Sequence, residues 1–250
     1  MSAPPPHPAL DTILERMTAA ADSRPMPRLL AVTKTQPADA ITRVAEALRA
    51  RAGAAAKGRI AIGENYVQET LAKQPALGGL GLEWHLIGHL QSNKAHDAAA
   101  AFDWVQTVDR LKLVEALARH RAPGQTPLNV LIQVNIDDEA SKHGCRPEDI
   151  ARLADAIADR PELRLRGLMT IPAPDPDMHR RRAAFRRMRG LFDALAARHC
   201  GIDTLSMGMS EDYALAIAEG ATMVRIGSAL FGPRAAKTLT PTPLLPPETA

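Results

Sequence analysis

The sequence predicts an α/β fold, a single (β/α)8 TIM-type barrel with an extra N-terminal helix. Eight short apolar runs recur along the 250 residues, and helical segments separate them. Strict alternation of strand and helix indicates a parallel sheet, and near-continuous apolar runs indicate strands that are covered on both faces. Eight such units in a chain of this length favour a closed barrel. A doubly wound open sheet is the alternative.

The apolar runs place the strands in order along the chain. We expect strands at residues 28–33, 59–63, 83–87, 103–107, 128–135, 163–169, 204–208 and 222–226. We expect helices at 38–51, 65–73, 91–101, 110–121, 148–159, 177–199, 212–219 and 228–232, with the extra helix at about 9–21. Pro37 and Pro147 stand where two of these helices begin, because a proline in the first turn loses no hydrogen bond.

One domain accounts for most of the chain. We expect the barrel over residues 9–234, between a flexible N-terminal arm at 1–8 and a Pro/Thr-rich C-terminal tail at 235–250. Hydrophobic residues make up 46% and charged residues 24% of the sequence, which is the composition of an ordinary globular domain. No apolar stretch is long enough to span a bilayer, and the start carries no signal region, so we expect no membrane partner.

Charge and cysteine content limit the classes of partner. The net charge of +3 suits phosphate-bearing small molecules, and it is too weak to indicate a nucleic-acid partner. Cys145 and Cys200 have no nearby Cys/His set, so we expect reduced thiols and a cytoplasmic location. His85 and His89 are four residues apart, a spacing that suits a metal ion on a helix; they flank a strand end, so we expect no metal site.

The first strand leads to Lys34. Leu30, Val32 and Lys34 share one strand face, so Lys34 points into the barrel if Leu30 does. Desolvation there would lower the pKa of its amine and free the lone pair for attack on an aldehyde. A solvated or salt-bridged lysine is the alternative reading.

Small and hydroxyl residues follow the seventh and eighth strands, where barrels often hold phosphate. Ser210 follows the seventh strand, and Gly227 and Ser228 follow the eighth. Small residues let backbone N–H groups approach an anion, and Ser228 opens a short helix whose N-terminus attracts phosphate. The alternative is an ordinary turn and helix cap.

Arg225 and Asn65 are two further candidates. Arg225 shares a strand face with Met223 and Gly227, so it too points inward, where it needs an acceptor. That acceptor is either a carboxylate or a heterocyclic ring nitrogen, which the guanidinium would leave unprotonated. Asn65 follows the second strand, and it either bonds a cofactor oxygen or caps the next helix.

The helix expected at 177–199 is rich in arginine. The run His179–Arg182, with Arg186, Arg187 and Arg189, lies mostly off the apolar stripe of the helix. A solvated face is the favoured reading of these residues, and an anionic partner is the lesser alternative.

Six motifs occur in a fixed order along the chain. They are Leu30–Pro37, Gly63–Glu69, Trp84–Lys94, Arg166–Met169, Ser206–Ser210 and Val224–Gly227. Together they resemble the pyridoxal phosphate homeostasis protein family. The resemblance covers residues 28–232, and so many ordered motifs make chance agreement improbable.

The resemblance implies a barrel similar to the N-terminal domain of alanine racemase. It implies that Lys34 holds pyridoxal 5'-phosphate (PLP) as an internal aldimine. Ser210, Gly227 and Ser228 would hold the phosphate, and Arg225 would face the pyridine nitrogen. It further implies a role in intracellular PLP homeostasis or delivery, with PLP-dependent apoenzymes as partners and no catalytic turnover.

Two enzymatic readings are the alternatives. A PLP-dependent racemase-like enzyme needs acid/base groups on both faces of its planar intermediate. In alanine racemase, a tyrosine from the second domain and partner subunit serves one face. This chain has two tyrosines, Tyr66 and Tyr213, and only 18 of its 250 residues follow Gly232, so we expect no second domain. A cofactor-free phosphosugar barrel enzyme lacks a clear catalytic carboxylate among the motifs.

Overall fold

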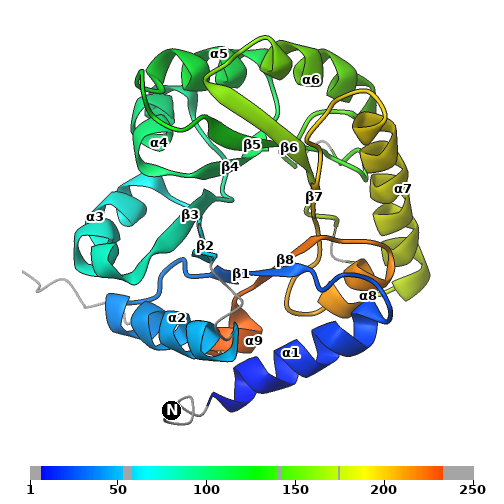
Figure 1. The fold of residues 1–250 in the computed structure, drawn as a ribbon. Coiled ribbons are helices and arrows are strands. Elements are labelled where there is room, and N and C mark those ends of the chain that lie inside the picture. The colour runs from blue at the N-terminus through cyan, green and yellow to red at the C-terminus, as the bar shows by residue number, and fades with distance from the viewer. Residues whose placement is uncertain (1–6, 53–57, 140–141, 174, 233–250) are drawn as a thin grey trace, which may run out of the picture.

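The computed structural model describes residues 7–52, 58–139, 142–173 and 175–232. Within them, eight parallel strands form a closed barrel in sequence order, with β1 paired to β8 (Figure 1). Helices surround the ring of strands, so the predicted (β/α)8 class is confirmed and the open sheet is excluded. The two candidate-bearing strands, β1 and β8, are neighbours, as closure of the barrel requires.

The strands lie within two residues of their expected bounds. They span Arg28–Val32 (β1), Ile60–Glu64 (β2), Leu82–Leu86 (β3), Trp104–Val108 (β4), Leu128–Gln133 (β5), Leu163–Met169 (β6), Thr204–Ser206 (β7) and Met223–Ile226 (β8). The seventh strand is shorter than expected, and the chain then turns through Gly208, whose φ of +89° is a left-handed conformation. A Cβ there would lie 2.5 Å from the Ala216 side chain, so the turn requires glycine.

The helices follow the predicted alternation. They span Pro8–Ala21 (α1), Ala38–Ala52 (α2), Val67–Leu77 (α3), Ala95–Ala101 (α4), Leu111–His120 (α5), Ile150–Ala158 (α6), Met178–Ala196 (α7), Tyr213–Ala218 (α8) and Ser228–Phe231 (α9). Single 3-10 turns cover Gly78–Leu80 (η1), Ser92–Lys94 (η2) and Pro147–Asp149 (η3). The expected helices at 91–101 and 148–159 therefore each begin with a 3-10 turn. The helix expected at 65–73 starts later and runs on to Leu77.

The extra N-terminal helix packs against the last two helices of the barrel. α1 contacts α8 and α9, which brings the start of the described chain beside its end (Figure 1). The ring nitrogen Nδ1 of His7 accepts from the Leu10 N–H at 3.2 Å and caps this helix. Residues 1–6 of the expected arm and the whole expected tail at 235–250 lie outside the described residues. No described helix is both long and apolar enough to cross a bilayer.

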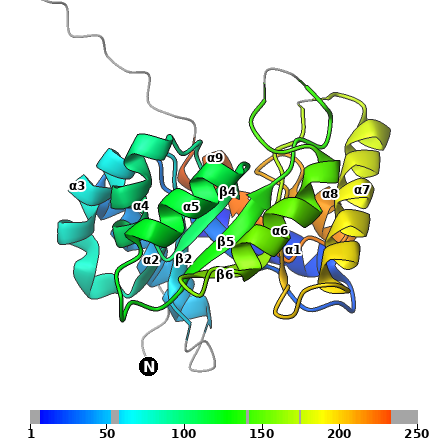
Figure 2. The same cartoon turned by 90° about the horizontal axis from the view of Figure 1, so that it is seen from above.

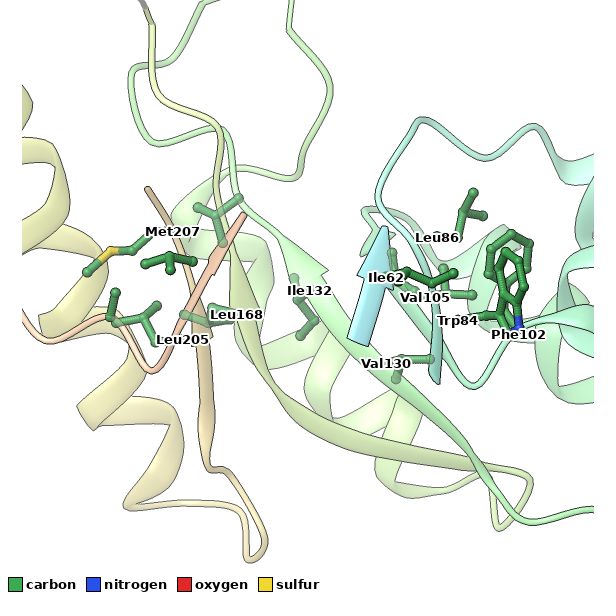
Figure 3. Packing of buried hydrophobic residues seen from close by; sticks show 14 of the residues in the cluster. Ile62, Trp84, Leu86, Phe102, Val105, Val130, Ile132, Leu168, Leu205 and Met207 are labelled. Carbon is green, nitrogen blue, oxygen red and sulfur yellow. The ribbon is translucent and has the colours of Figure 1, made fainter. Parts of the chain in front are cut away.

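The main apolar core lies between the strands and the helices. Figure 3 shows part of it, with side chains such as Ile62, Val105, Ile132 and Leu168 contributed by successive strands. Helical residues, among them Leu113 on α5, complete the same cluster. Burial of this layer is the main source of stability, because the hydrophobic effect scales with the apolar area removed from water.

The barrel interior holds a second, mixed set of side chains. Leu30, Ala61, Ile87 and Met223 form a small apolar cluster there. Gln106 on β4 reaches Met223 on β8, with 3.2 Å between Nε2 and Sδ, a contact that crosses the barrel. Leu30 therefore points inward. From the sequence, we expected Lys34 to point into the barrel if Leu30 does. In the view from above, the described parts of the connection that follows β5, at 134–139 and 142–146, lie at one end of the barrel (Figure 2).

The close approach of the β2 and β3 ends predicts the effect of a single methyl group. In Gly88→Ala, the added Cβ would lie 2.2 Å from the backbone oxygen of Asn65. We expect the free energy of unfolding in urea to fall by about 1–3 kcal/mol, the usual cost of overpacking. In the control Gly190→Ala on α7, the Cβ meets nothing within 4 Å. That variant should gain up to about 1 kcal/mol from helix propensity. Equal stability of the two variants would contradict this account.

Candidate functional site

A cavity of about 400 Å³ opens at the carboxyl ends of the strands. The six residues that the sequence proposed as cofactor contacts all line it: Lys34, Asn65, Ser210, Arg225, Gly227 and Ser228. Apolar side chains, including Val32 and Ile87, and the segment 171–173 after β6 complete the wall. The cavity therefore combines apolar walls with convergent polar groups, as small-molecule sites do.

Lys34 stands in a turn that is held on both sides. The Thr33 N–H donates to the Gly63 carbonyl at 2.9 Å, which ties the end of β1 to β2. The Thr35 N–H donates to a Glu69 carboxylate oxygen at 2.6 Å. Thr35 has a φ of +63°, a conformation that β-branched residues rarely adopt. The backbone around Lys34 is therefore fixed by its surroundings, as strained positions at functional sites are.

A buried charged cluster lies behind this turn. The Glu64 side chain at the end of β2 is fully buried, and it accepts from the Thr33 hydroxyl at 2.6 Å and from the Lys73 ammonium at 2.9 Å. Lys73 also donates to Glu69 at 2.6 Å. Burial raises the pKa of Glu64, against the opposing hydrogen bonds from Thr33 and Lys73. Sequence reasoning missed this cluster, although a glutamate that ends an apolar run was a visible signal.

Ser210 holds the two N–H groups at the start of α9. Its hydroxyl oxygen accepts from the backbone of Gly227 and of Ala229, each at 3.3 Å. These bonds are longer than the usual 2.9–3.0 Å, so a stronger acceptor could replace them. The N-cap of α9 is Gly227, which has no side chain and therefore makes no side-chain cap bond. The converging N–H groups are suited to bind an anionic oxygen.

Asn65 lines the cavity and does not cap the following helix. α3 begins at Val67, and its N-cap is Tyr66, which makes no side-chain cap bond. Of the two readings of Asn65, the capping one is therefore wrong. The reading as a cofactor contact stays a prediction.

Arg225 is buried in the barrel interior and bonded to neutral acceptors. It is 2% exposed, and its guanidinium donates to the Ser206 hydroxyl at 2.8 Å and to the Thr170 carbonyl at 2.7 Å. Burial lowers the pKa of Arg225 to about 10, partly offset by the charge of Asp212. No carboxylate within the described part of the chain forms an ion pair with it. The carboxylate reading from the sequence is therefore not the arrangement found.

A chain of hydrogen bonds continues from Arg225 through the barrel. The Ser206 hydroxyl donates to the Gln106 carbonyl oxygen at 2.7 Å, and Gln106 Nε2 lies 2.9 Å from His85 Nδ1. His85 Nε2 lies 2.7 Å from Glu83, which also pairs with Arg28 at 2.8 Å. Interior polar groups in this chain therefore satisfy one another.

The protonation states of the groups in this series of hydrogen bonds follow from their burial and from their neighbours. Complete burial lowers the pKa of His85, against the opposing effect of Glu83. The ring is therefore neutral at pH 7, with Nδ1 accepting from Gln106 and Nε2 donating to Glu83. Burial opposes ionisation of Glu83, but the hydrogen bond from His85 and the charge and hydrogen bond of Arg28 lower its pKa to about 2.

Arg181 on α7 also lines the cavity, contrary to the solvated face expected for this helix. Its side chain is 14% exposed, and Asp212 and Glu211 lie 3.9 Å away. Its Nε is buried and has no hydrogen-bond partner among the described residues. The signal was present in the sequence, since Arg181 lies one turn before Phe185 on the apolar stripe. Such an orphaned donor points to an anion in the cavity.

Two kinds of sequence comparison describe what the chain is similar to. A family profile described as "Alanine racemase, N-terminal domain" matches residues 9–235. A pyridoxal phosphate homeostasis protein of Pseudomonas aeruginosa is 52% identical over 206 residues, which cover 82% of this chain and 84% of that protein. The protein of the same name from Escherichia coli K12 is 51% identical over 209 residues, covering 82% and 85%.

Solved structures of similar proteins share the fold. PipY of Synechococcus elongatus, determined with PLP bound, has a TM-score of 0.72 and 36% identity, covering 88% of this chain and all of that chain. Alanine racemase of Corynebacterium glutamicum has a TM-score of 0.59 and 19% identity, covering 93% of this chain and 63% of the racemase chain. The second likeness concerns the fold alone.

The hydrogen-bond chain behind Arg225 predicts an effect on stability. Gln106→Leu removes the acceptor of Ser206 and the donor to His85 and leaves their buried polar atoms unpaired. We expect the free energy of unfolding in urea to fall by about 1–3 kcal/mol. The control Gln68→Leu changes an exposed glutamine on α3 and should stay within about 0.5 kcal/mol of the wild type. A Gln106 variant as stable as the control would show that these hydrogen bonds contribute nothing to the free energy of unfolding.

Proposed function

The chain belongs to the pyridoxal phosphate homeostasis protein family, and we propose that it binds PLP through Lys34 at the barrel mouth. The observation that carries the proposal is the convergence of an amine, an anion cradle and a buried guanidinium on one cavity. The PLP-bound structure of PipY, 36% identical to this chain, supports the same ligand class. The cavity of about 400 Å³ lies in the range that cofactor sites have.

Lys34 would hold the cofactor covalently. Its ε-amine would supply the nucleophile for the aldehyde of the cofactor, and the new bond to the carbonyl carbon would form with loss of one water molecule. The bound cofactor supplies this aldehyde and an electron-withdrawing ring. The held turn around Lys34, with the bonds of Thr33 and Thr35, supports this role because it presents the amine in a fixed direction.

The backbone at the start of α9 would hold the phosphate. The N–H groups of Gly227 and Ala229 already converge on the Ser210 oxygen, and Ser228 adds a hydroxyl to the same wall. Phosphate oxygens are stronger acceptors than this hydroxyl, since charge-assisted hydrogen bonds are about twice as strong as neutral ones. Arg181 adds positive charge to the cavity and gains an acceptor there.

Arg225 would face the pyridine nitrogen. Ser206 and Thr170 fix its guanidinium, which keeps its proton at pH 7 and so leaves the ring nitrogen without one. A ring held in this way withdraws fewer electrons than one that faces a carboxylate. This arrangement favours holding the cofactor over carbanion chemistry.

We further propose that the protein carries PLP without catalytic turnover. Racemisation needs a second acid/base group opposite the lysine. Tyr66 is 61% exposed, Tyr213 is buried beneath Arg16, and neither lines the cavity. Asp212 does line it, but its carboxylate accepts from the Met209 N–H at 2.7 Å. A racemase-like enzyme is the alternative function.

A carrier of this kind would serve intracellular PLP homeostasis or delivery. PLP-dependent apoenzymes are the recipients that fit such a role, and the names of the relatives support homeostasis as the process. Cys145 and Cys200 are both free, which supports a reducing, cytoplasmic setting.

The covalent bond is tested by spectroscopy of the purified protein. We expect PLP-saturated protein to show the visible absorbance of a protonated Schiff base, and borohydride to fix the cofactor on Lys34. Lys34→Ala should lose both signals, because no other described lysine lines the cavity. The control Lys112→Ala changes an exposed lysine on α5 and should keep both. An adduct that peptide mapping places on another lysine would refute the assignment.

The absence of turnover is tested with amino acids as substrates. Because the cavity offers no tyrosine opposite Lys34, we expect PLP-saturated wild type to interconvert D- and L-alanine no faster than Lys34→Ala. Chiral chromatography measures the enantiomers over time. Racemisation by the wild type well above that background would favour the enzyme over the carrier.

A further inference from the structure

Two histidines and an aspartate meet outside the cavity at the ends of three neighbouring strands. His89 follows β3, Asp109 follows β4, and His143 lies in the connection after β5. One imidazole nitrogen from each histidine and one carboxylate oxygen all lie within 4.8 Å of one another. The two rings stack with their centroids 3.7 Å apart. None of the three residues lines the cavity of about 400 Å³.

We propose that His89, Asp109 and His143 form a binding site for a divalent transition-metal ion, with Zn²⁺ as the representative ligand. Two imidazole nitrogens and one carboxylate oxygen are a ligand set that zinc uses in proteins. Three protein ligands leave a coordination position open for water or a small anion. The site does not depend on the PLP proposal, because it shares no residue with that cavity.

The segment that carries His143 is folded back onto β5. The Cys145 N–H donates to the Gln133 carbonyl at 2.8 Å, and the Asn135 N–H donates to the Cys145 carbonyl at 2.9 Å. The Gln133 side chain donates to the His143 carbonyl at 3.2 Å. Gly144 has a φ of +123° and lies so close to Asn135 that a Cβ would approach its nitrogen to 2.6 Å. The backbone therefore fixes the place from which the His143 ring extends.

The other two ligands are held by β4 and its end. The Thr107 hydroxyl donates to the Gly88 carbonyl at 2.9 Å, which ties the residue before His89 to β4. The Asp109 side chain is 10% exposed, and Arg110 donates to one of its oxygens at 2.6 Å. Metal-binding carboxylates usually accept such a second hydrogen bond, which orients them toward the ion.

The spacing of the three ligand atoms suits a metal ion. Zn–N and Zn–O bonds of about 2.1 Å place tetrahedral ligand atoms about 3.4 Å apart. Both rings are exposed, so they have room to turn and close the remaining gap.

The proposed site differs from the histidine pair that the sequence suggested. The sequence suggested only a His85 and His89 pair, and it gave no reason to expect metal there. In the structure, His85 lies inside the barrel between Glu83 and Gln106, and it has no place in the cluster. The partners of His89 come from distant parts of the chain, which only closure of the barrel brings together.

Zinc titration of the untagged full-length protein tests the proposal. A colorimetric chelator competes for Zn²⁺ at constant pH, and the wild type should take up one high-affinity equivalent. We expect His89→Ala and His143→Ser to weaken this binding at least about 10-fold, since loss of even a supporting partner costs that much. Circular dichroism without metal should be unchanged in both, because the two rings are exposed.

Three control variants separate this site from other zinc ligands. His120→Ala changes another histidine pair, in which the rings of His96 and His120 lie edge to face with their centroids 5.2 Å apart. Cys200→Ser removes the exposed thiol. Lys34→Ala removes the proposed cofactor lysine. All three should bind zinc as the wild type does. Equal affinity of the wild type and His143→Ser would overturn the site, and so would a loss that appears in His120→Ala or Cys200→Ser instead.

Discussion

A guanidinium enclosed by the barrel is the constraint on which the rest of the interior depends. A buried charge is costly unless hydrogen bonds compensate for it, and Arg225 obtains them from Ser206 and Thr170. Ser206 in turn needs Gln106, and Gln106 needs His85. The middle of the barrel is therefore polar where many barrels stack aliphatic layers. Stability must come from the apolar layer outside the strands, which is continuous from α1 to α9.

Because the outer apolar layer provides the stability, the loops at the carboxyl ends of the strands can carry functional residues. The outer layer holds the strands in register whatever follows their carboxyl ends, so the loops are free to carry reactive groups. Around Lys34, the buried Glu64 and Lys73 fix a turn with a strained Thr35. At the nearby end of β7, which β8 separates from β1, Gly208 allows the sharp turn that carries Ser210 to the start of α9. The backbone thus holds both of these parts of the mouth in place.

The sequence predicted what depends on order along the chain. Alternating apolar runs gave eight strands, and strand ends placed Lys34, Ser210 and Gly227 at one mouth, because parallel strands bring their ends together. It did not predict what depends on side-chain direction or on pairing between distant segments. Arg181 lies on the apolar stripe of α7 but was grouped with its solvated neighbours. The Glu64–Lys73 pair and the His89 cluster depend on contacts that no periodicity records.

The N-terminal helix α1 precedes the eight strand–helix units of the barrel, and its packing has a consequence for the proposed phosphate site. α1 packs on α9, whose first turn provides the N–H groups that converge on Ser210. The first helix of the described chain thus supports the turn near its other end, where the N–H groups of Gly227 and Ala229 meet Ser210. If these groups hold the cofactor phosphate as proposed, fraying of α1 would loosen their arrangement and shorten the time for which the ligand stays bound.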